Sequence, residues 1–275
     1  MRVSLLKKIL VWAFVSIILV AVYLPIVVLI LSSFFKTKAA PGSFSLSAFA
    51  TLFRDNQLLT AVLNTFILTV AASLIAAVLG TFTAIGMFNM KKIGRQAISA
   101  ANQIPVVNAD IVTAVGFALL IVAVKDTVLS FVQGWPILII AHVMITMPYV
   151  VLTILPRLRQ LNPNVYEAAL DLGAKPWVAT IKVLLPQLLG ASIAGFALAF
   201  TLSLDDFVVA YFNNGQGSIN TISTLLYTRL VKQNPMDSFN ALSSILFVVI
   251  LAALFAVNIA AARRREKERK TVKAK

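Results

Sequence analysis

Residues 160–187 read QLNPNVYEAALDLGAKPWVATIKVLLPQ and form a polar segment between two apolar runs. Asn162 is a residue type that accepts backbone N–H groups at a helix start, and Pro163 fits the first helical position. Gly173 is suited to end a helix in the left-handed conformation, and Pro176 can open the next one. The segment, here called the elbow, therefore predicts two short helices joined by a tight turn.

Outward from the elbow the chain is apolar almost throughout. Of its 275 residues, 60% are hydrophobic and 12% charged, with a mean hydropathy of +0.92, against about 45–50% and about 25% in soluble domains. Six apolar runs approach or exceed the roughly 20 residues that a helix needs to cross a bilayer. In lipid the backbone N–H and C=O groups of each span must form hydrogen bonds within that span, which requires a helix. We predict an all-α polytopic membrane protein, one domain over residues 1–275. Its six transmembrane helices are expected at 9–31, 58–87, 98–124, 137–155, 188–204 and 242–262.

Basic residues orient these spans. The side that holds both termini and the elbow carries 18 Lys and Arg, and the other side carries six. Eight of the 18 lie in the tail, residues 263–275. Because positive loops stay inside, both termini are predicted to be cytoplasmic in a bacterial inner or plasma membrane. The net charge of +14 then indicates contact with anionic lipid headgroups and not with nucleic acid.

The motifs of the common enzyme and metal chemistries are missing from the sequence. It has no Cys, no glycine-rich phosphate loop with Lys and Ser or Thr, and one histidine, His142. We therefore expect no catalytic residue, no metal ligand and no cofactor on this chain. His142 lies within an apolar run, where it is either a hydrogen-bonded packing residue or part of a transport pathway.

Two further features bear on organisation. The first outer loop carries Phe44, Leu46, Phe49, Leu52 and Phe53, a spacing typical of an amphipathic helix at the membrane interface. No internal repeat is visible, which argues against the secondary transporters built from inverted repeats. Six helices enclose only a small pathway, so a functional pore is expected to need a second subunit.

The elbow carries a string that resembles the EAA loop of ABC-importer permeases. The matching residues, in order, are Glu167-Ala168-Ala169, Gly173, Val183 and Leu185-Pro186. The resemblance implies that the elbow is a coupling helix, with Glu167, Ala168, Ala169 and Gly173 seated in a cleft of a cytoplasmic ATPase. It also implies that ATP and Mg bind on that partner chain.

The resemblance runs from the first span to the sixth. It is closest to the C-type permease of spermidine/putrescine importers, through Phe34-Phe35-Lys36, Asp110-Ile111-Val112, residues 200–212 (FTLSLDDFVVAYF) and Asn240-Ala241-Leu242. It implies a type I ABC-importer permease fold, a second, B-type permease forming a heterodimer, two ATPase subunits and an extracellular polyamine-binding protein. One departure is that Ala109 stands where the family often has Pro.

Three carboxylates suit a polycationic substrate. Asp110 lies about 11 residues into the third predicted span, which at 1.5 Å per residue is roughly 16 Å and near mid-bilayer. Asp205 and Asp206 close the fifth span, about 100° apart around a helix. Either at least one of them contacts the pathway, while the other caps a neighbouring helix or holds a loop, or both make structural hydrogen bonds.

Tyr149, Phe207 and Tyr211 lie at similar depths and are the aromatic candidates for contact with amines, through cation–π interactions. Each of them, taken singly, also suits packing or an interfacial belt. The resemblance points to ATP-driven polyamine import. Permeases for an iron complex or another organic cation share parts of these motifs, and a standalone channel or carrier is a further alternative. The preference between putrescine and spermidine stays open.

Overall fold

The computed structural model describes residues 5–35, 43–124, 134–214, 219–232 and 238–252, together with residues 255 and 259. Within these ranges every regular element is a helix, as predicted, and extended backbone pairs only in one isolated bridge between Phe35 and Phe44. The chain divides into two compact units. Unit 1 joins Met1–Leu59 with Thr228–Lys275, and unit 2 is Thr60–Tyr227.

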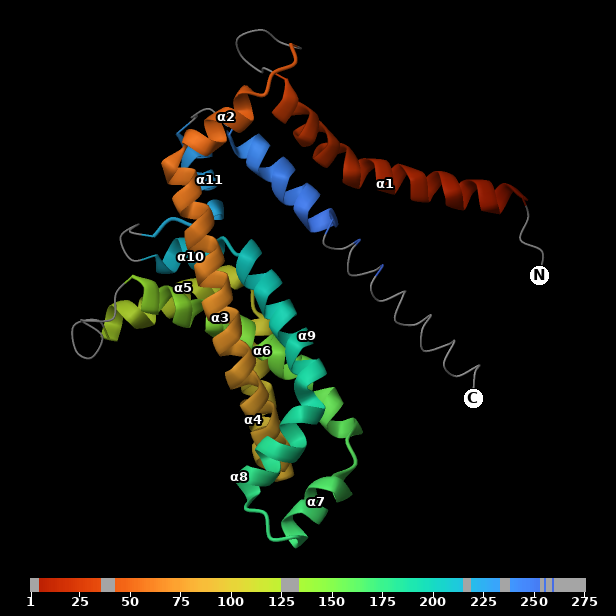
Figure 1. The fold of residues 1–275 in the computed structure, drawn as a ribbon, viewed down its shortest axis with the longest axis vertical. Helices are drawn as coiled ribbons and strands as arrows, with labels where there is room; N and C mark the ends of the chain where they lie inside the picture. The colour runs from red at the N-terminus through yellow and green to blue at the C-terminus, as the bar shows by residue number, and fades with distance from the viewer. Residues whose placement is uncertain are drawn as a thin grey trace. The chain divides into compact units, whose positions relative to one another are not determined.

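Unit 2 contains the elbow and the candidate pathway residues. Figure 1 shows α6 and α9 side by side, with α7 and α8 at one end of the unit. Its helices are α3 (Asn56–Asn89, from Thr60 on), α4 (Lys92–Val107), α5 (Asp110–Val124), α6 (Trp135–Gln160), α7 (Pro163–Asp171), α8 (Pro176–Ala179), the π-helical turn η1 (Thr180–Leu184), α9 (Leu185–Asp205), α10 (Val208–Asn213) and α11 (Ile222–Val231, up to Tyr227).

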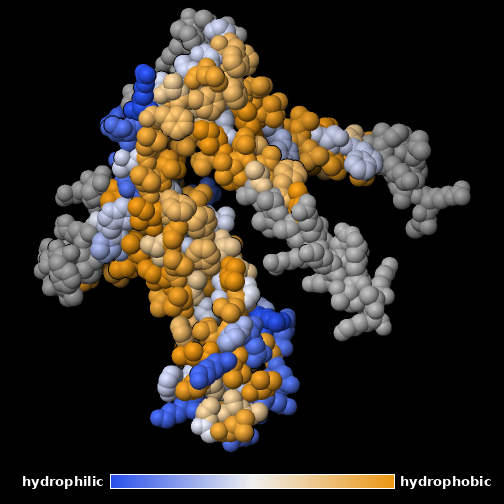
Figure 2. Space-filling view, viewed as in Figure 1, coloured by the Kyte–Doolittle hydropathy of each residue, from blue (hydrophilic) through white to orange (hydrophobic). Residues whose placement is uncertain are grey.

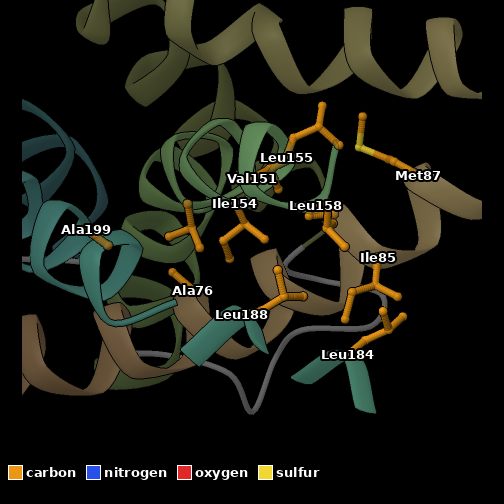
Figure 3. Packing of buried hydrophobic residues seen from close by; sticks show 12 residues of the cluster. Ala76, Ile85, Met87, Val151, Ile154, Leu155, Leu158, Leu184, Leu188 and Ala199 are labelled. Atoms are coloured by element: carbon orange, nitrogen blue, oxygen red, sulfur yellow. The ribbon is translucent and has the colours of Figure 1, made fainter. Parts of the chain in front are cut away.

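The core of unit 2 lies where α6 packs against α3 and α9. Figure 3 shows Ile154 and Leu158 of α6 among residues of the other two helices, such as Ala76 and Leu188. Val150 lies at the closest approach, because a Cβ added at Gly80 would come within 2.7 Å of it and one at Gly195 within 3.0 Å. Glycine at these two positions lets the three helices pack closely, as small residues do in membrane bundles.

Among the described residues, four helices are each long and apolar enough to cross a membrane. They are Leu10–Phe34, Asn56–Asn89, Trp135–Gln160 and Pro176–Asp205, and they correspond to the predicted spans 9–31, 58–87, 137–155 and 188–204. The sixth prediction, 242–262, begins within a described helix, Ser238–Ala252. Most of its remainder and the basic tail 263–275 lie outside the described residues, so the total of six stays a prediction.

The third predicted span, 98–124, is bent. It consists of α4 and α5, which meet at an angle of 108° around Asn108 and Ala109. Asn108 is extended, with φ −74° and ψ 151°, and Asp110 lies in the first turn of α5, where the helix dipole favours a carboxylate. The estimate that Asp110 lies near mid-bilayer assumed one straight helix, so it does not apply to two helices that meet at this angle.

Unit 1 contains α1 (Leu5–Phe34) and α2 (Ser47–Arg54), which contact each other, and the helix Ser238–Ala252. The sequence predicted an amphipathic helix in the first outer loop, and α2 confirms the helix, with Leu52 buried and Phe53 67% exposed. Phe44 precedes this helix and stacks on Phe34 at 6.2 Å between ring centroids.

An ion pair joins the segments of unit 1. The Arg229 guanidinium donates to both carboxylate oxygens of Asp55, at 2.8 Å to Oδ1, and to Gln57. Asp55 also accepts the backbone N–H of Leu58 at 3.1 Å, so it caps α3. The hydrogen bonds from Arg229 hold the pKa of the Asp55 carboxyl below its usual range and raise the pKa of Arg229. Phe239 of the last described helix lies 5.4 Å from the guanidinium.

Candidate functional site: an exposed elbow and an acidic cavity

The elbow has the local structure that the sequence predicts. The Asn162 side chain accepts the N–H of Asn164 at 3.0 Å, and Pro163 begins α7. Gly173 has φ +85°, and the N–H of Ala174 returns to the carbonyl of Ala169 at 3.0 Å. A Cβ at Gly173 would meet no atom within 4 Å. The backbone angle, and not lack of space, is therefore what favours glycine there.

The outer face of the elbow is open. Figure 2 shows hydrophilic residues gathered at the end of unit 2 that α7 and α8 form. Glu167 and Ala168 are exposed and Ala169 is half-buried. Two large apolar side chains lie among the polar ones, Leu172 at 88% exposure and Trp177 at 65%. An exposed apolar patch with a polar rim is typical of a surface that contacts another protein.

Most of the predicted pathway residues meet around a cavity in unit 2. The cavity has a volume of about 320 Å³ and opens between α4, α5, α6, α9 and α10. Its polar and aromatic lining comes from Asp110, Tyr149, Thr201, Asp205, Asp206 and Phe207. Asp110 and the adjacent pair Asp205 and Asp206, which are far from Asp110 in the sequence, thus line one small cavity, together with two of the three predicted aromatic residues.

Asp206 is anchored by the helix that follows it. Its carboxylate accepts the backbone N–H of Ala210 at 2.9 Å and of Val209 at 3.3 Å. Ser223 donates to its backbone carbonyl at 2.8 Å. The Asp206 side chain is only 8% exposed, whereas Asp205 is exposed. One of the pair therefore caps a neighbouring helix, as one of the alternatives anticipated, while both carboxylates line the cavity.

His142 contacts Asp206 but is not part of the cavity lining. It is fully buried in α6, and its Nε2 lies 3.5 Å from Oδ2 of Asp206. Its Nδ1 lies 2.8 Å from the carbonyl of Leu138. His142 is buried and hydrogen-bonded, which both sequence alternatives allow, but the sequence did not indicate the contact with Asp206. The 63 positions between them contain no spacing signal that would pair these two residues.

The aromatic candidates divide between the cavity and its surroundings. Tyr149 and Phe207 belong to the lining, whereas Tyr211 does not. Tyr211 instead contacts Phe207, with 5.3 Å between ring centroids. Tyr227 contacts both rings, at 5.0 and 5.3 Å, and sequence reasoning missed it. The three rings form a cluster beside the cavity.

The described residues offer no metal site. No three His, Cys, Asp or Glu side chains in that part of the chain gather closely enough to hold an ion. Carboxylates and aromatic faces are, however, the groups that bind ammonium ions, by charge and by cation–π contact. The cavity is chemically suited to an organic polycation.

Similar proteins are known by sequence. The chain is 34% identical over 242 residues to the spermidine/putrescine transport system permease protein PotC of Haemophilus influenzae, a match that covers 87% of this chain and 91% of that protein. It is 32% identical to the putrescine transport system permease protein PotI of Escherichia coli K12, covering 82% of this chain and 80% of that one.

Solved structures and a family model agree on the fold. A bacterial ABC transporter involved in the import of the acidic polysaccharide alginate has a TM-score of 0.67 at 20% identity, covering 94% of this chain and 96% of that one. The family model described as "Binding-protein-dependent transport system inner membrane component" matches residues 76–266. The chain therefore belongs to that family, the inner-membrane permeases of ABC importers.

Proposed function

We propose that this chain is a membrane subunit of an ATP-driven polyamine importer, carrying spermidine or putrescine inward. The observation that carries the proposal is the cavity, where Asp110, Asp205 and Asp206 meet beside Tyr149 and Phe207. The names of its relatives PotC and PotI point to the same substrate class. Polyamines are flexible chains with two or more ammonium groups, which suit separated carboxylates with aromatic and aliphatic surface between them.

The same cavity suits passage as well as binding. Asp205 is exposed and Asp206 is held by backbone N–H groups, so the carboxylates offer sites of different strength along a short path. Conduction requires binding strong enough to admit a cation and weak enough to release it. We infer that an extracellular binding protein supplies the affinity and that Phe207 and Tyr211, with Tyr227, guide the ammonium groups to the cavity.

The elbow is proposed as the coupling element. Glu167, Ala168, Ala169 and Gly173 would lie in a cleft of a cytoplasmic ATPase subunit, with Leu172 and Trp177 adding apolar contact. ATP and Mg would bind on two such partners and not on this chain. A second permease, of B type, would complete the pathway as a heterodimer. Both termini would lie on the cytoplasmic side, so that the elbow faces the ATPases.

The test is to co-express the chain with its genomic neighbours and purify the complex through it. We expect a second permease and an ATPase to co-purify, and the ATPase activity to rise with spermidine-loaded binding protein. The variant Glu167→Lys should lose this stimulation while the chain still reaches the membrane. Normal uptake by Glu167→Lys would overturn the coupling role of that residue.

Other outcomes separate the alternatives. An ATPase complex whose activity does not change with polyamines but rises with an iron complex or another organic cation would support the coupling role and refute the polyamine substrate. A chain that purifies alone and transports without nucleotide would instead be a channel or secondary carrier.

A further inference from the structure

The hydrogen bonds of His142 restrict its protonation. The Leu138 carbonyl can only accept, so the hydrogen bond at 2.8 Å requires a proton on Nδ1. Nε2 then carries either a lone pair or the second proton of an imidazolium. It lies 3.5 Å from Oδ2 of Asp206 and has no hydrogen-bond partner among the described residues. A lone pair on Nε2 is repelled by the carboxylate, whereas an imidazolium N–H is attracted to it but requires a charge to be buried, so the two forms are set against each other at this site.

The protonation of His142 changes the charge that faces the cavity. The titratable groups around the pair are Asp205 from α9, Asp110 from α5 and Tyr149 from α6 itself. Within the described residues, α4 and α10 contribute only Pro105 and Val208 to the lining. Counting the three carboxylates as ionised, the group carries three negative charges with neutral His142 and two with imidazolium.

We propose that His142 is a specificity-determining residue that sets the cavity to two or three negative charges and so biases it between diamines and triamines. This rests on the proposed function in polyamine import. His142 does not line the cavity, so it acts through Asp206 and not by touching substrate. A triamine brings one more ammonium group than a diamine, and that group gains most when His142 is neutral.

The experiment uses the assembled importer in proteoliposomes with saturating, substrate-loaded binding protein. Uptake rates of spermidine and putrescine are measured between about pH 5.5 and 8.5, which brackets the ordinary pKa of histidine and lies above that of aspartate. We expect the spermidine-to-putrescine ratio of the wild type to rise with pH by about tenfold, the effect of one unit charge on one further ammonium group nearby.

Two variants isolate the cause. His142→Gln can donate to Asp206 but cannot become a cation, so its ratio should stay at the high-pH value throughout. Asp205→Asn removes one cavity charge and leaves His142, so its ratio should shift toward putrescine at every pH while keeping the slope. The binding protein and the ATPase are common to all three proteins, so their own pH dependence cancels in the comparison.

The outcomes are distinct. A flat wild-type ratio overturns the inference, whether or not His142→Gln assembles, and so does a His142→Gln ratio that rises in parallel with the wild type. In both cases polyamine transport itself stands. If the wild type transports neither polyamine, the proposed function fails first and the inference falls with it.

Discussion

The elbow takes its defining contacts from residues 162–176, whereas the acidic cavity takes its lining from five helices spread over residues 105–208. The elbow is exposed and depends on one cap and one backbone angle. The cavity depends on how α6 packs against its neighbours. Local changes should therefore affect coupling without loss of fold, and packing changes should affect the cavity through the fold.

The largest effect is expected from Gly173→Val in the elbow. A β-branched residue at φ +85° is strained by roughly 1–2 kcal/mol or more, so the turn should open. We expect uptake to fall to background while the chain still accumulates in the membrane, measured by transport assay and membrane immunoblot.

Two variants control for the change of side chain at Gly173. Gly173→Asn should retain part of the uptake, because Asn tolerates the left-handed region. Gly94→Ala should retain all of it, since a Cβ there meets nothing within 4 Å and the backbone there is helical. Wild-type uptake by Gly173→Val would refute the dependence of coupling on this turn.

The next effect is expected from Asp206→Asn in the cavity. Asn keeps one acceptor for the N–H groups of α10 but loses the charge, so uptake should fall about tenfold or more, the effect of about one unit charge at short range. Asp205→Asn should reduce uptake less, because its carboxylate is more exposed and more strongly screened. Uptake into proteoliposomes, assayed together with substrate-stimulated ATPase activity, is the measurement. If neither variant alters it, both carboxylates have structural roles.

A smaller effect is expected where α3 packs against α6 in the core of unit 2. A Cβ at Gly80 would lie 2.7 Å from Val150 and 3.3 Å from the Met147 carbonyl, so Gly80→Ala should lower stability by about 1–3 kcal/mol through overpacking. Thermal unfolding in detergent measures this. The double variant with Val150→Ala should recover part of the loss, and Gly86→Ala, with open space around it, should be close to neutral. Equal loss in both glycine variants would contradict the close approach.

The smallest effect is expected at the Asp55–Arg229 pair. Arg229 holds the pKa of Asp55 below its unfolded value. The pair therefore contributes stability above the unfolded pKa, and that contribution is lost as the pH falls through the folded pKa. Both side chains are partly exposed, so the contribution is at most about 1 kcal/mol. Unfolding measured from neutral to acidic pH should show a shallower loss in Asp55→Asn than in the wild type. Parallel curves would show that the pair contributes nothing.

The predictions made from sequence fared differently in these two regions. The caps of the elbow were predicted to the residue, because Asn162, Pro163 and Gly173 act on their own backbone. The chemistry of the cavity was predicted as a set of candidates, since carboxylates in apolar runs are rare. Sequence spacing did not predict that the three carboxylates line one cavity, or that Tyr211 lies outside its lining.

The sequence by itself determined four of the predicted membrane helices and the elbow, because hydropathy over about 20 residues and local capping are properties of contiguous chain. Only the tertiary structure decided the bend between α4 and α5, the cavity that gathers three aspartates, and the contact of His142 with Asp206. The physical reason is that these features depend on side chains from different helices. Helical periodicity alone does not encode which helix faces meet.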